Sequence, residues 1–450
     1  MLRVCLRVFS LMILLLQIGV VLAQDDAVDL LQLYGKATEF DPILRTALYR
    51  SELGEERVRE SRAGVRPQLA ATADASAVNQ DIKKSDNLLF QVGESTFFNS
   101  AFSITLSQSV YRQDAFARLP QAKAVAGQAE AELRAEEQDL IYRLADAVFG
   151  FMAARDILEF AVAERTAIHR QLLESEERLQ SGLGTLTDVH EARARYALAQ
   201  ATEIGADDEL EAARLVIAEI TGELPANVKA LSETFPLVAP DKPNVELWVE
   251  AARFQNPRIS ALEAAADVAA QEMRVQRGQG RRPALDLVAA YNYSDSGGSE
   301  FAGGGGSVIS TGSVGLRLIV PIYDGGGSSA LVRSAALERD IALQGLERAK
   351  RVVEAETRKS FQGVTSGITR VEALWQTVFS QEAALADKEE RMRAGLATGL
   401  EVLDARRDLF LARSDLAQAR YDYVLASLSL KRWSGILDVA DLRAINAYLQ

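Results

Sequence analysis

The chain has 450 residues, of which 25% are charged and 48% hydrophobic, and its formal net charge at pH 7 is −13. This acidic balance excludes a protein that binds nucleic acid through a broad basic surface. The single cysteine, Cys5, lies within the first 23 residues, so the chain that follows them can form no disulfide.

The first 23 residues are typical of a secretory signal peptide. Arg3 and Arg7 precede the apolar run LMILLLQIGVV, and the small residue Ala23 ends a Val-Leu-Ala sequence. An uncleaved membrane anchor is the alternative, but the run is shorter than the roughly 20 residues that a spanning helix needs. We therefore predict an exported protein that is cleaved before Gln24.

Similar sequences then begin two halves of the chain. Asp41-Pro42 and Asn256-Pro257 are each expected to end one helix and start another, since Asp or Asn can cap a helix and proline fits its first turn. Arg66-Pro67 and Arg282-Pro283 are expected to end the second helix, because the residue before proline disfavours helical angles.

The duplication predicts two copies of one structural plan, at residues 24–222 and 244–434. The segment 223–243 joins them, and its prolines forbid a continuous helix there. Residues 435–450 form a short C-terminal segment.

After each Arg-Pro pair the apolar period changes from about 3.6 to 2, which indicates strands. The alternation is clear in ALDLVAAYNYS (284–294) and FSITLSQSVY (102–111), and weaker in QLAATADASAV (68–78) and TGSVGLRLIVPIY (311–323). Strands of about ten residues with this alternation suit a tilted membrane strand, with one face in lipid and one in water.

Long helices are predicted beyond each pair of strands. Apolar residues step alternately by four and three from Leu140 to Ala161 and again from Val402 to Trp433, as in a coiled-coil seam. Each seam adjoins a similar glycine-marked sequence, RLQSGLGTLTDVHEARA (178–194) or RMRAGLATGLEVLDARR (391–407). We expect Gly182 and Gly395, 213 positions apart, to adopt the left-handed conformation at the tips of two antiparallel hairpins.

Four strands cannot close a barrel by themselves. An open edge in lipid leaves backbone groups unpaired, at a cost of several kcal/mol each. Since closed bacterial barrels begin at about eight strands, a dimer, a trimer and a tetramer all remain open.

Several of these sequences together carry a family resemblance: VPIYDGGGSSALVRSAA (320–336), AEITGELP (218–225), ARYDYVLASLSLKRWSGIL (419–437), the two tips and the duplicated Arg-Pro. The chain resembles the TolC-type outer-membrane channels, the outer membrane factor family, over essentially the whole mature chain. The resemblance implies an α+β membrane protein and a homotrimeric channel-tunnel. Each chain would give four strands to one 12-stranded β-barrel, and the coiled-coil hairpins would form a periplasmic α-barrel with a belt made of 223–243 and 435–450.

The implied function is a passive exit duct in the outer membrane that extends into the periplasm and serves multidrug efflux or type I secretion. A periplasmic adaptor, or membrane fusion protein, would dock at the tips Gly182, Leu183, Gly395 and Leu396. An inner-membrane pump or ABC transporter would drive transport.

Two other classes of protein fit the sequence less well. A periplasmic adaptor would carry one hairpin flanked by compact β-domains, and a coiled-coil filament would have no use for alternating strands. No enzyme signature, metal cluster or cofactor site is expected, because the two histidines, His169 and His190, lie in charged helical stretches.

The acidic residues of the second tip are candidate pore residues. Glu401 and Asp404 lie three positions apart, hence on one helical face, and Asp408 continues the stripe. A solvated helix face is the ordinary interpretation of such acids. The resemblance implies instead that EVLDA (401–405) matches an Asp-x-x-Asp element whose carboxylates ring the periplasmic aperture and attract cations.

The first tip carries the matching half of a gate. Its candidate latch residues are Thr187, Asp188 and Glu191. The resemblance implies that a Thr-Asp pair at this tip is bonded by an Arg and a Tyr of the second tip. Ala397 and Met392 stand at those two positions here. Arg391 and Arg393 are close enough in sequence to replace them as latch residues, at a gate formed by the inner hairpins.

Overall fold

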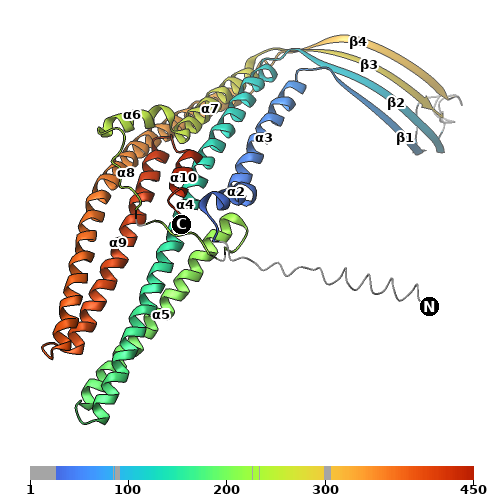
Figure 1. The fold of residues 1–450 in the computed structure, drawn as a ribbon. Coiled ribbons are helices and arrows are strands. Elements are labelled where there is room, and N and C mark those ends of the chain that lie inside the picture. The colour runs from blue at the N-terminus through green and yellow to red at the C-terminus, as the bar shows by residue number, and fades with distance from the viewer. Residues whose placement is uncertain (1–26, 85, 87–91, 226, 233, 298–305) are drawn as a thin grey trace, which may run out of the picture. The chain divides into compact units, whose positions relative to one another are not determined.

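The computed structural model describes residues 27–84, 86, 92–225, 227–232, 234–297 and 306–450, so the predicted signal peptide lies outside the described residues. The same order of elements occurs twice, namely two helices, two strands and two long helices (Figure 1). The first set is α2 (Leu30–Phe40), α3 (Pro42–Ala63), β1 (Gln68–Ile82), β2 (Gly93–Tyr111), α4 (Gln113–Gln180) and α5 (Leu186–Thr221). The second set is α6 (Val245–Gln255), α7 (Pro257–Arg281), β3 (Ala284–Ser296), β4 (Ser307–Ile319), α8 (Gly327–Arg393) and α9 (Gly399–Trp433), followed by α10 (Val439–Asn446).

The chain divides into two compact units. The sheet unit comprises Thr46–Glu136 and Ala251–Ala355, and the hairpin unit comprises the residues up to Arg45, Glu137–Glu250 and Glu356–Gln450. Among the described residues, no helix combines the length and the apolar character that crossing a membrane requires.

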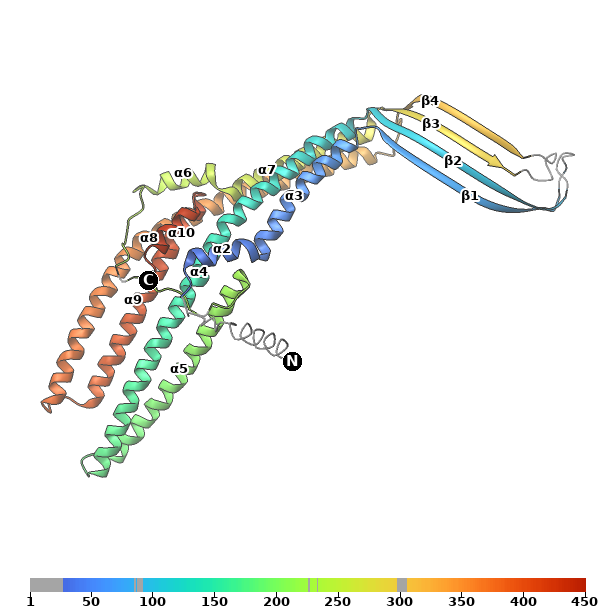
Figure 2. The same cartoon turned by 45° about the vertical axis from the view of Figure 1, so that its right-hand side comes forward.

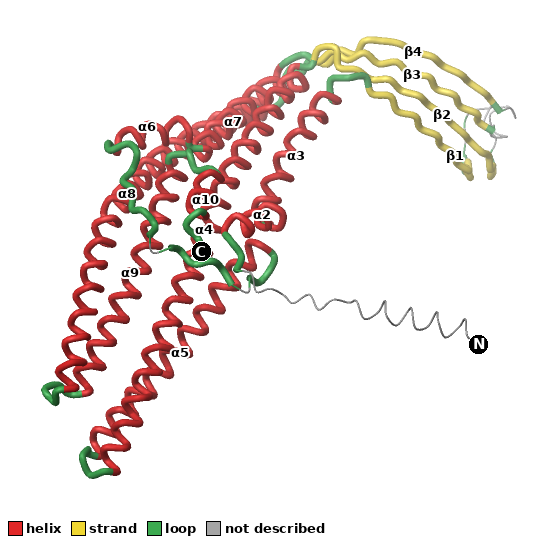
Figure 3. The backbone as a smooth tube through the Cα atoms, in the orientation of Figure 1, coloured by secondary structure: helices red, strands yellow, loops and turns green. Residues whose placement is uncertain are grey.

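The sheet unit contains one antiparallel sheet with the strand order β1-β2-β3-β4 (Figure 3). The two halves of the chain meet in its middle, where Asn99 of β2 pairs with Ser296 of β3. β1 and β4 form the two edges. The sheet therefore joins both repeats into one surface.

Several strand boundaries differ from the sequence prediction: β1 and β3 end later, at Ile82 and Ser296, β4 begins earlier, at Ser307, and two further boundaries have a clear cause. β2 begins at Gly93 and not near Phe102. Polar and apolar residues alternate poorly between these positions, but backbone pairing with β1 continues through them, for example where Phe97 pairs with Val78. β4 ends at Ile319, whereas the alternation predicted a strand to Tyr323. Pro321 explains the early end, since proline has no N–H with which to continue a ladder.

The hairpin unit contains the hairpins α4–α5 and α8–α9, which lie side by side (Figures 1 and 2). Most positions of the predicted seams are buried, including Leu140 and Leu144 on α4 and Ala405 and Leu409 on α9, whereas Leu158 and Leu416 are half-buried. The Tyr421 hydroxyl on α9 also donates to Asp156 on α4 across 2.6 Å. Burial raises the pKa of both side chains, so this polar contact is part of the packed interior.

The segment between the repeats and the C-terminal residues are joined by backbone bonds. Ala230 N–H donates to Gln450 across 3.0 Å, and Ser232 N–H donates to Tyr448 across 2.8 Å. Arg155 of α4 donates to the carbonyl of Val228 across 2.7 Å. These bonds join the two segments to each other and the first of them to α4, within the hairpin unit.

Asp41 and Asn256 begin their helices as predicted. The Asn256 side chain accepts from the backbone N–H of Arg258 at 2.9 Å, and Asp41 accepts from that of Leu44 at 2.8 Å. Asp41 is only 2% exposed and also binds Arg143 of α4, with distances of 2.8 and 3.3 Å. The cap thus ties the corner between α2 and α3 to the long helix α4.

Candidate functional site

Both hairpin tips contain the predicted left-handed glycines. Gly182 has φ +73° and Gly395 has φ +71°. The following residues close each turn, because Leu183 N–H donates to Arg178 and Leu396 N–H to Arg391, both across 2.8 Å. Leu183 is 75% exposed and Leu396 is 72% exposed. Each tip therefore presents an exposed leucine directly after its glycine, and the first tip also exposes Leu186 at the start of α5.

The second helix of each hairpin starts with the same type of cap. In α5, Asp188 accepts from Thr185 N–H at 3.0 Å and its own N–H donates to the Thr185 hydroxyl at 3.2 Å. In α9, Thr398 and Glu401 form the equivalent capping box. Asp188 and Glu401 are thus structurally equivalent, and each carboxylate stabilises the start of its own helix.

The hydrogen bonds from Thr185 hold the pKa of Asp188 below its usual range. A carboxyl with a lowered folded-state pKa contributes stability above its unfolded-state pKa and loses it as pH falls through the folded value. We expect hydrogen exchange of residues 181–190 to be faster in Asp188→Ala than in wild type at pH 7. The difference should disappear well below the unfolded-state pKa of about 4. An equal difference at pH 3 and pH 7 would show that the charge is irrelevant to this cap.

An arginine that the sequence did not single out joins the two hairpins. Arg195 of α5 donates to Asp404 of α9 across 3.1 Å and to Glu191 of its own helix across 3.3 Å. The structure thereby brings together two of the predicted site residues, Glu191 and Asp404. An alignment of the two tips could have revealed Arg195. With a spacing of 213 positions, Glu191 aligns with Asp404, another acid, whereas Arg195 aligns with Asp408, a residue of opposite charge.

The other predicted gate residues lie apart from this contact. Arg391 lies 3.9 Å from Asp387, one turn earlier in α8. Thr187, Arg393 and Asp408 are exposed. Among the described ion pairs, none connects Arg391 or Arg393 with Asp188.

A cavity of about 570 Å³ separates the hairpins near their tips. The first hairpin contributes mainly charged residues, including Glu174, Arg178 and Arg195, and the second contributes Met392 and Leu403. At one side the hairpins approach closely, because a Cβ placed on Gly399 would lie 2.7 Å from the side-chain nitrogen of Gln171. Around this cavity, charged side chains of the first hairpin therefore face mainly small and apolar residues of the second.

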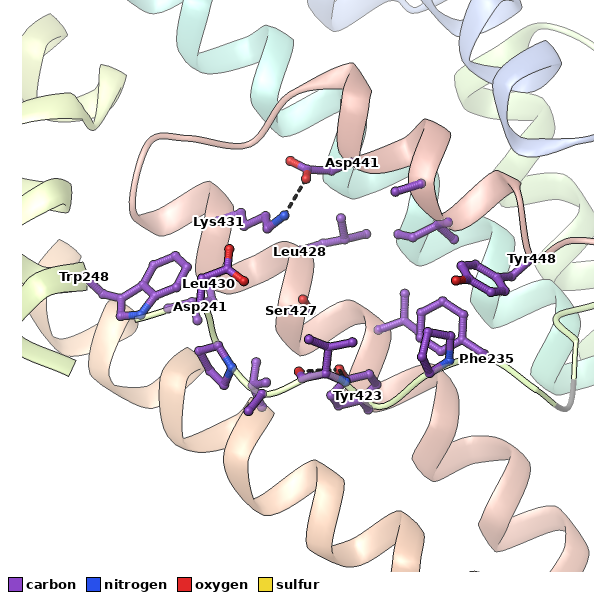
Figure 4. Close-up of a pocket in the computed structure, with 18 residues that line it drawn as sticks. Phe235, Asp241, Trp248, Tyr423, Ser427, Leu428, Leu430, Lys431, Asp441 and Tyr448 are labelled. Atoms are coloured by element: carbon purple, nitrogen blue, oxygen red, sulfur yellow. Dashed lines mark hydrogen bonds and ion pairs between the residues drawn. The ribbon is translucent and has the colours of Figure 1, made fainter. Parts of the chain in front are cut away.

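A second cavity, of about 290 Å³, lies elsewhere in the hairpin unit (Figure 4). Phe235, Trp248 and Tyr448 line it with apolar residues of α9 and α10, and Lys431 pairs with Asp441 at 2.5 Å. None of the predicted site residues lines this cavity.

The sequence predicted no metal site and a packed or solvated place for the histidines. His169 lies against Tyr196, with ring centroids 4.9 Å apart. Within the part of the chain that the structure describes, no three His, Cys, Asp or Glu side chains are grouped so that they could hold a metal ion.

Comparison with known proteins gives consistent matches over most of the chain. The model of the family "Outer membrane efflux protein" matches residues 33–223 and 248–435. Outer membrane protein TolC of Vibrio cholerae is 31% identical and the match covers 94% of each chain, and alkaline protease secretion protein AprF of Pseudomonas aeruginosa is 28% identical over 94% of this chain and 87% of that protein. The CmeC outer membrane channel of Campylobacter jejuni superposes with a TM-score of 0.79 at 16% identity, covering 95% of this chain and 91% of that one, which shows a shared fold.

Proposed function

Because the chain belongs to the outer membrane efflux protein family, we propose that it is the outer-membrane exit duct of a tripartite efflux pump or a type I secretion system. The observation that carries this proposal is the match along 94% of the chain to both a TolC channel and a protease secretion protein. The chain is an outer-membrane protein. The alternative of a periplasmic adaptor is not supported, since the relatives are outer-membrane channels and secretion ducts.

Complementation of a strain that lacks its own outer-membrane duct tests the proposal. Restored resistance to toxic compounds would identify an efflux duct, and restored appearance of a protein substrate in the medium would identify a secretion duct. A chain that reaches the outer membrane and restores neither would contradict the proposal. An adaptor and an inner-membrane pump or ABC transporter are its expected partners.

The open edges of the sheet support an oligomer, and the family resemblance implies that it contains three chains. β1 and β4 of one chain are edge strands, and unpaired strand edges are costly in lipid. Three chains, pairing β1 of one with β4 of the next, would close a 12-stranded barrel.

We therefore expect native mass measurement in mild detergent to give the mass of three chains. A stable monomer recovered from bilayers would contradict this architecture.

The acidic stripe of α9 supports a cation-attracting aperture. Glu401, Asp404 and Asp408 are exposed along α9. Three chains would place three copies of each acid around one opening, and such rings favour cations. The proposed latch residues of this gate are Thr187, Asp188, Glu191, Arg391 and Arg393.

A change of two acids tests the aperture while leaving the contact between Arg195 and Asp404 intact. Glu401→Gln keeps a residue that suits a capping box, and Asp408→Asn removes an exposed charge. We expect the double variant to have weaker cation selectivity than wild type, measured as a reversal potential nearer zero in a salt gradient across a planar bilayer. Asp415→Asn, an exposed acid farther along α9, is the control and should change little. Identical reversal potentials for wild type and the double variant would show that these acids form a solvated helix face.

A further inference from the structure

We propose that the arginine-rich ends of α3 and α7 bind the phosphate groups of anionic phospholipids in the periplasmic leaflet of the outer membrane. The inference rests on the proposed function for the orientation of the sheet, whose helix-bearing end would face the periplasm. It starts from a concentration of positive charge in the sheet unit, within a chain whose formal net charge is −13.

Both repeats carry an excess of arginine just before their first strand. Residues 57–66 contain four arginines and one acid, and residues 274–282 contain four arginines and no acid. β1 and β3 follow these segments and both pair antiparallel with β2, so they run in the same direction. The two arginine segments therefore lie at the same end of the sheet, where α3 and α7 meet it (Figure 2).

Most of these arginines have no carboxylate partner in the part of the chain that the structure describes. The exposed ones are Arg57, Arg59, Arg62, Arg66, Arg274, Arg277 and Arg282. Among the described ion pairs, only the one between Arg59 and Glu56 involves any of these seven. Basic side chains near an anionic membrane surface each strengthen binding by a factor of about 5. The two segments can therefore bind anionic headgroups without first breaking many ion pairs.

A cavity of about 610 Å³ lies between the end of α3 and the start of α4. Arg57 and Arg118 line it together with one acid, Glu60. The Ser61 hydroxyl also lines the cavity, and it is buried without a described hydrogen-bond partner. Guanidinium groups bind phosphate through charge-assisted hydrogen bonds, and a hydroxyl can donate one more. The first repeat therefore offers a place for the phosphate of a headgroup.

The adjoining strands provide an apolar surface for acyl chains. Leu69 of β1 is 72% exposed and follows Arg66 by three residues, which span at most about 11 Å. Leu69 pairs with Leu106 of β2, and the same row continues through Ala289 of β3 to Val314 of β4. Val314 is 78% exposed. A positive segment next to an exposed apolar row matches an amphiphile with an anionic headgroup, and a free anion would use only the arginines.

Retention of lipids by the purified full-length protein tests the inference. The protein is immobilised in a non-ionic detergent and incubated with equal amounts of phosphatidylglycerol, which is anionic, and phosphatidylethanolamine, which has no net charge. The retained lipids are then extracted and quantified. We expect wild type to retain more phosphatidylglycerol. Arg66→Gln with Arg282→Gln removes one charge from each segment, so the ratio of the two retained lipids should fall about 5-fold.

Two further variants complete the design. Adding Arg57→Gln and Arg118→Gln should lower the ratio further, because these residues line the cavity between α3 and α4. Arg348→Gln with Arg351→Gln is the matched control and should leave the ratio at the wild-type value. Both control residues are exposed on α8, on the order of 30 Å from its start. Native electrophoresis checks that the variants compared have the same assembly.

The inference fails if wild type retains the two lipids equally, since the charge of the headgroup would then play no part. An unchanged ratio in Arg66→Gln with Arg282→Gln would also overturn it, as would an equal fall in the control. Displacement of phosphatidylglycerol by an equal concentration of inorganic phosphate would identify a site for free anions and overturn the assignment to a lipid. Because binding is measured in detergent and without transport, these results leave the proposed duct untouched, and complementation tests it separately.

Discussion

Replacing Gly182 and Gly395 together by valine is expected to abolish export while the protein still inserts in the outer membrane. Both glycines have left-handed backbone angles, with φ +73° and +71°. A residue with a Cβ is disfavoured there by about 1–2 kcal/mol, and β-branched residues are among the worst suited. No atom lies within 4 Å of a Cβ built at either position, so the penalty arises from the backbone alone.

The strain should act on the docking surface that we propose for an adaptor. A rearranged turn would displace Leu183 and Leu396, the exposed leucines that follow the two glycines. Export in a complemented strain and crosslinking to the adaptor are the measurements, with native electrophoresis as the check on assembly. Asparagine tolerates left-handed angles, so the control with Gly182→Asn and Gly395→Asn should retain most export. Full export by the double valine variant would show that the tips are simple turns and not a docking surface.

Replacing Asp41 by alanine is expected to cause the largest loss of stability among the single changes considered. Asp41 is 2% exposed, caps α3 through Leu44 N–H and binds Arg143 with both carboxylate oxygens. Removing one partner of a buried pair typically costs 3–5 kcal/mol, because the other charge stays buried. Asp139 still lies 3.4 Å from Arg143, so we expect the lower end, about 3 kcal/mol.

The measurement is the denaturant concentration at which the helical circular dichroism signal is half lost, with all variants in the same detergent. Asp41→Asn keeps an acceptor for Leu44 N–H and should fall between wild type and Asp41→Ala. The control Glu56→Ala removes the partner of Arg59 from an exposed pair, which contributes at most about 1 kcal/mol. If Asp41→Ala unfolds at the same concentration as Glu56→Ala, the corner at Asp41 does not stabilise the hairpin unit.

Several elements were readable from the sequence because their causes are local. The caps at Asp41 and Asn256 depend on residues two or three positions away, and both are present. The left-handed angles at Gly182 and Gly395 follow from a turn that closes within five residues. The seams of α4 and α9 follow from a periodicity that repeats every few residues, and most of the positions that it marks are buried.

The contacts between the two repeats were decided by the tertiary structure. The pairing of β2 with β3 joins strands from different repeats, and no local pattern selects that neighbour. Arg195 and Asp404 are 209 positions apart, and whether they meet depends on how two hairpins are rotated and placed against each other. The sequence by itself determined that each tip carries acids beside a glycine turn, because the stability of a cap or a turn depends on a few neighbouring residues. Only the folded chain could decide which acid Arg195 binds. The energy of this contact depends on the distance between two side chains that are far apart in the sequence and that the fold brings together.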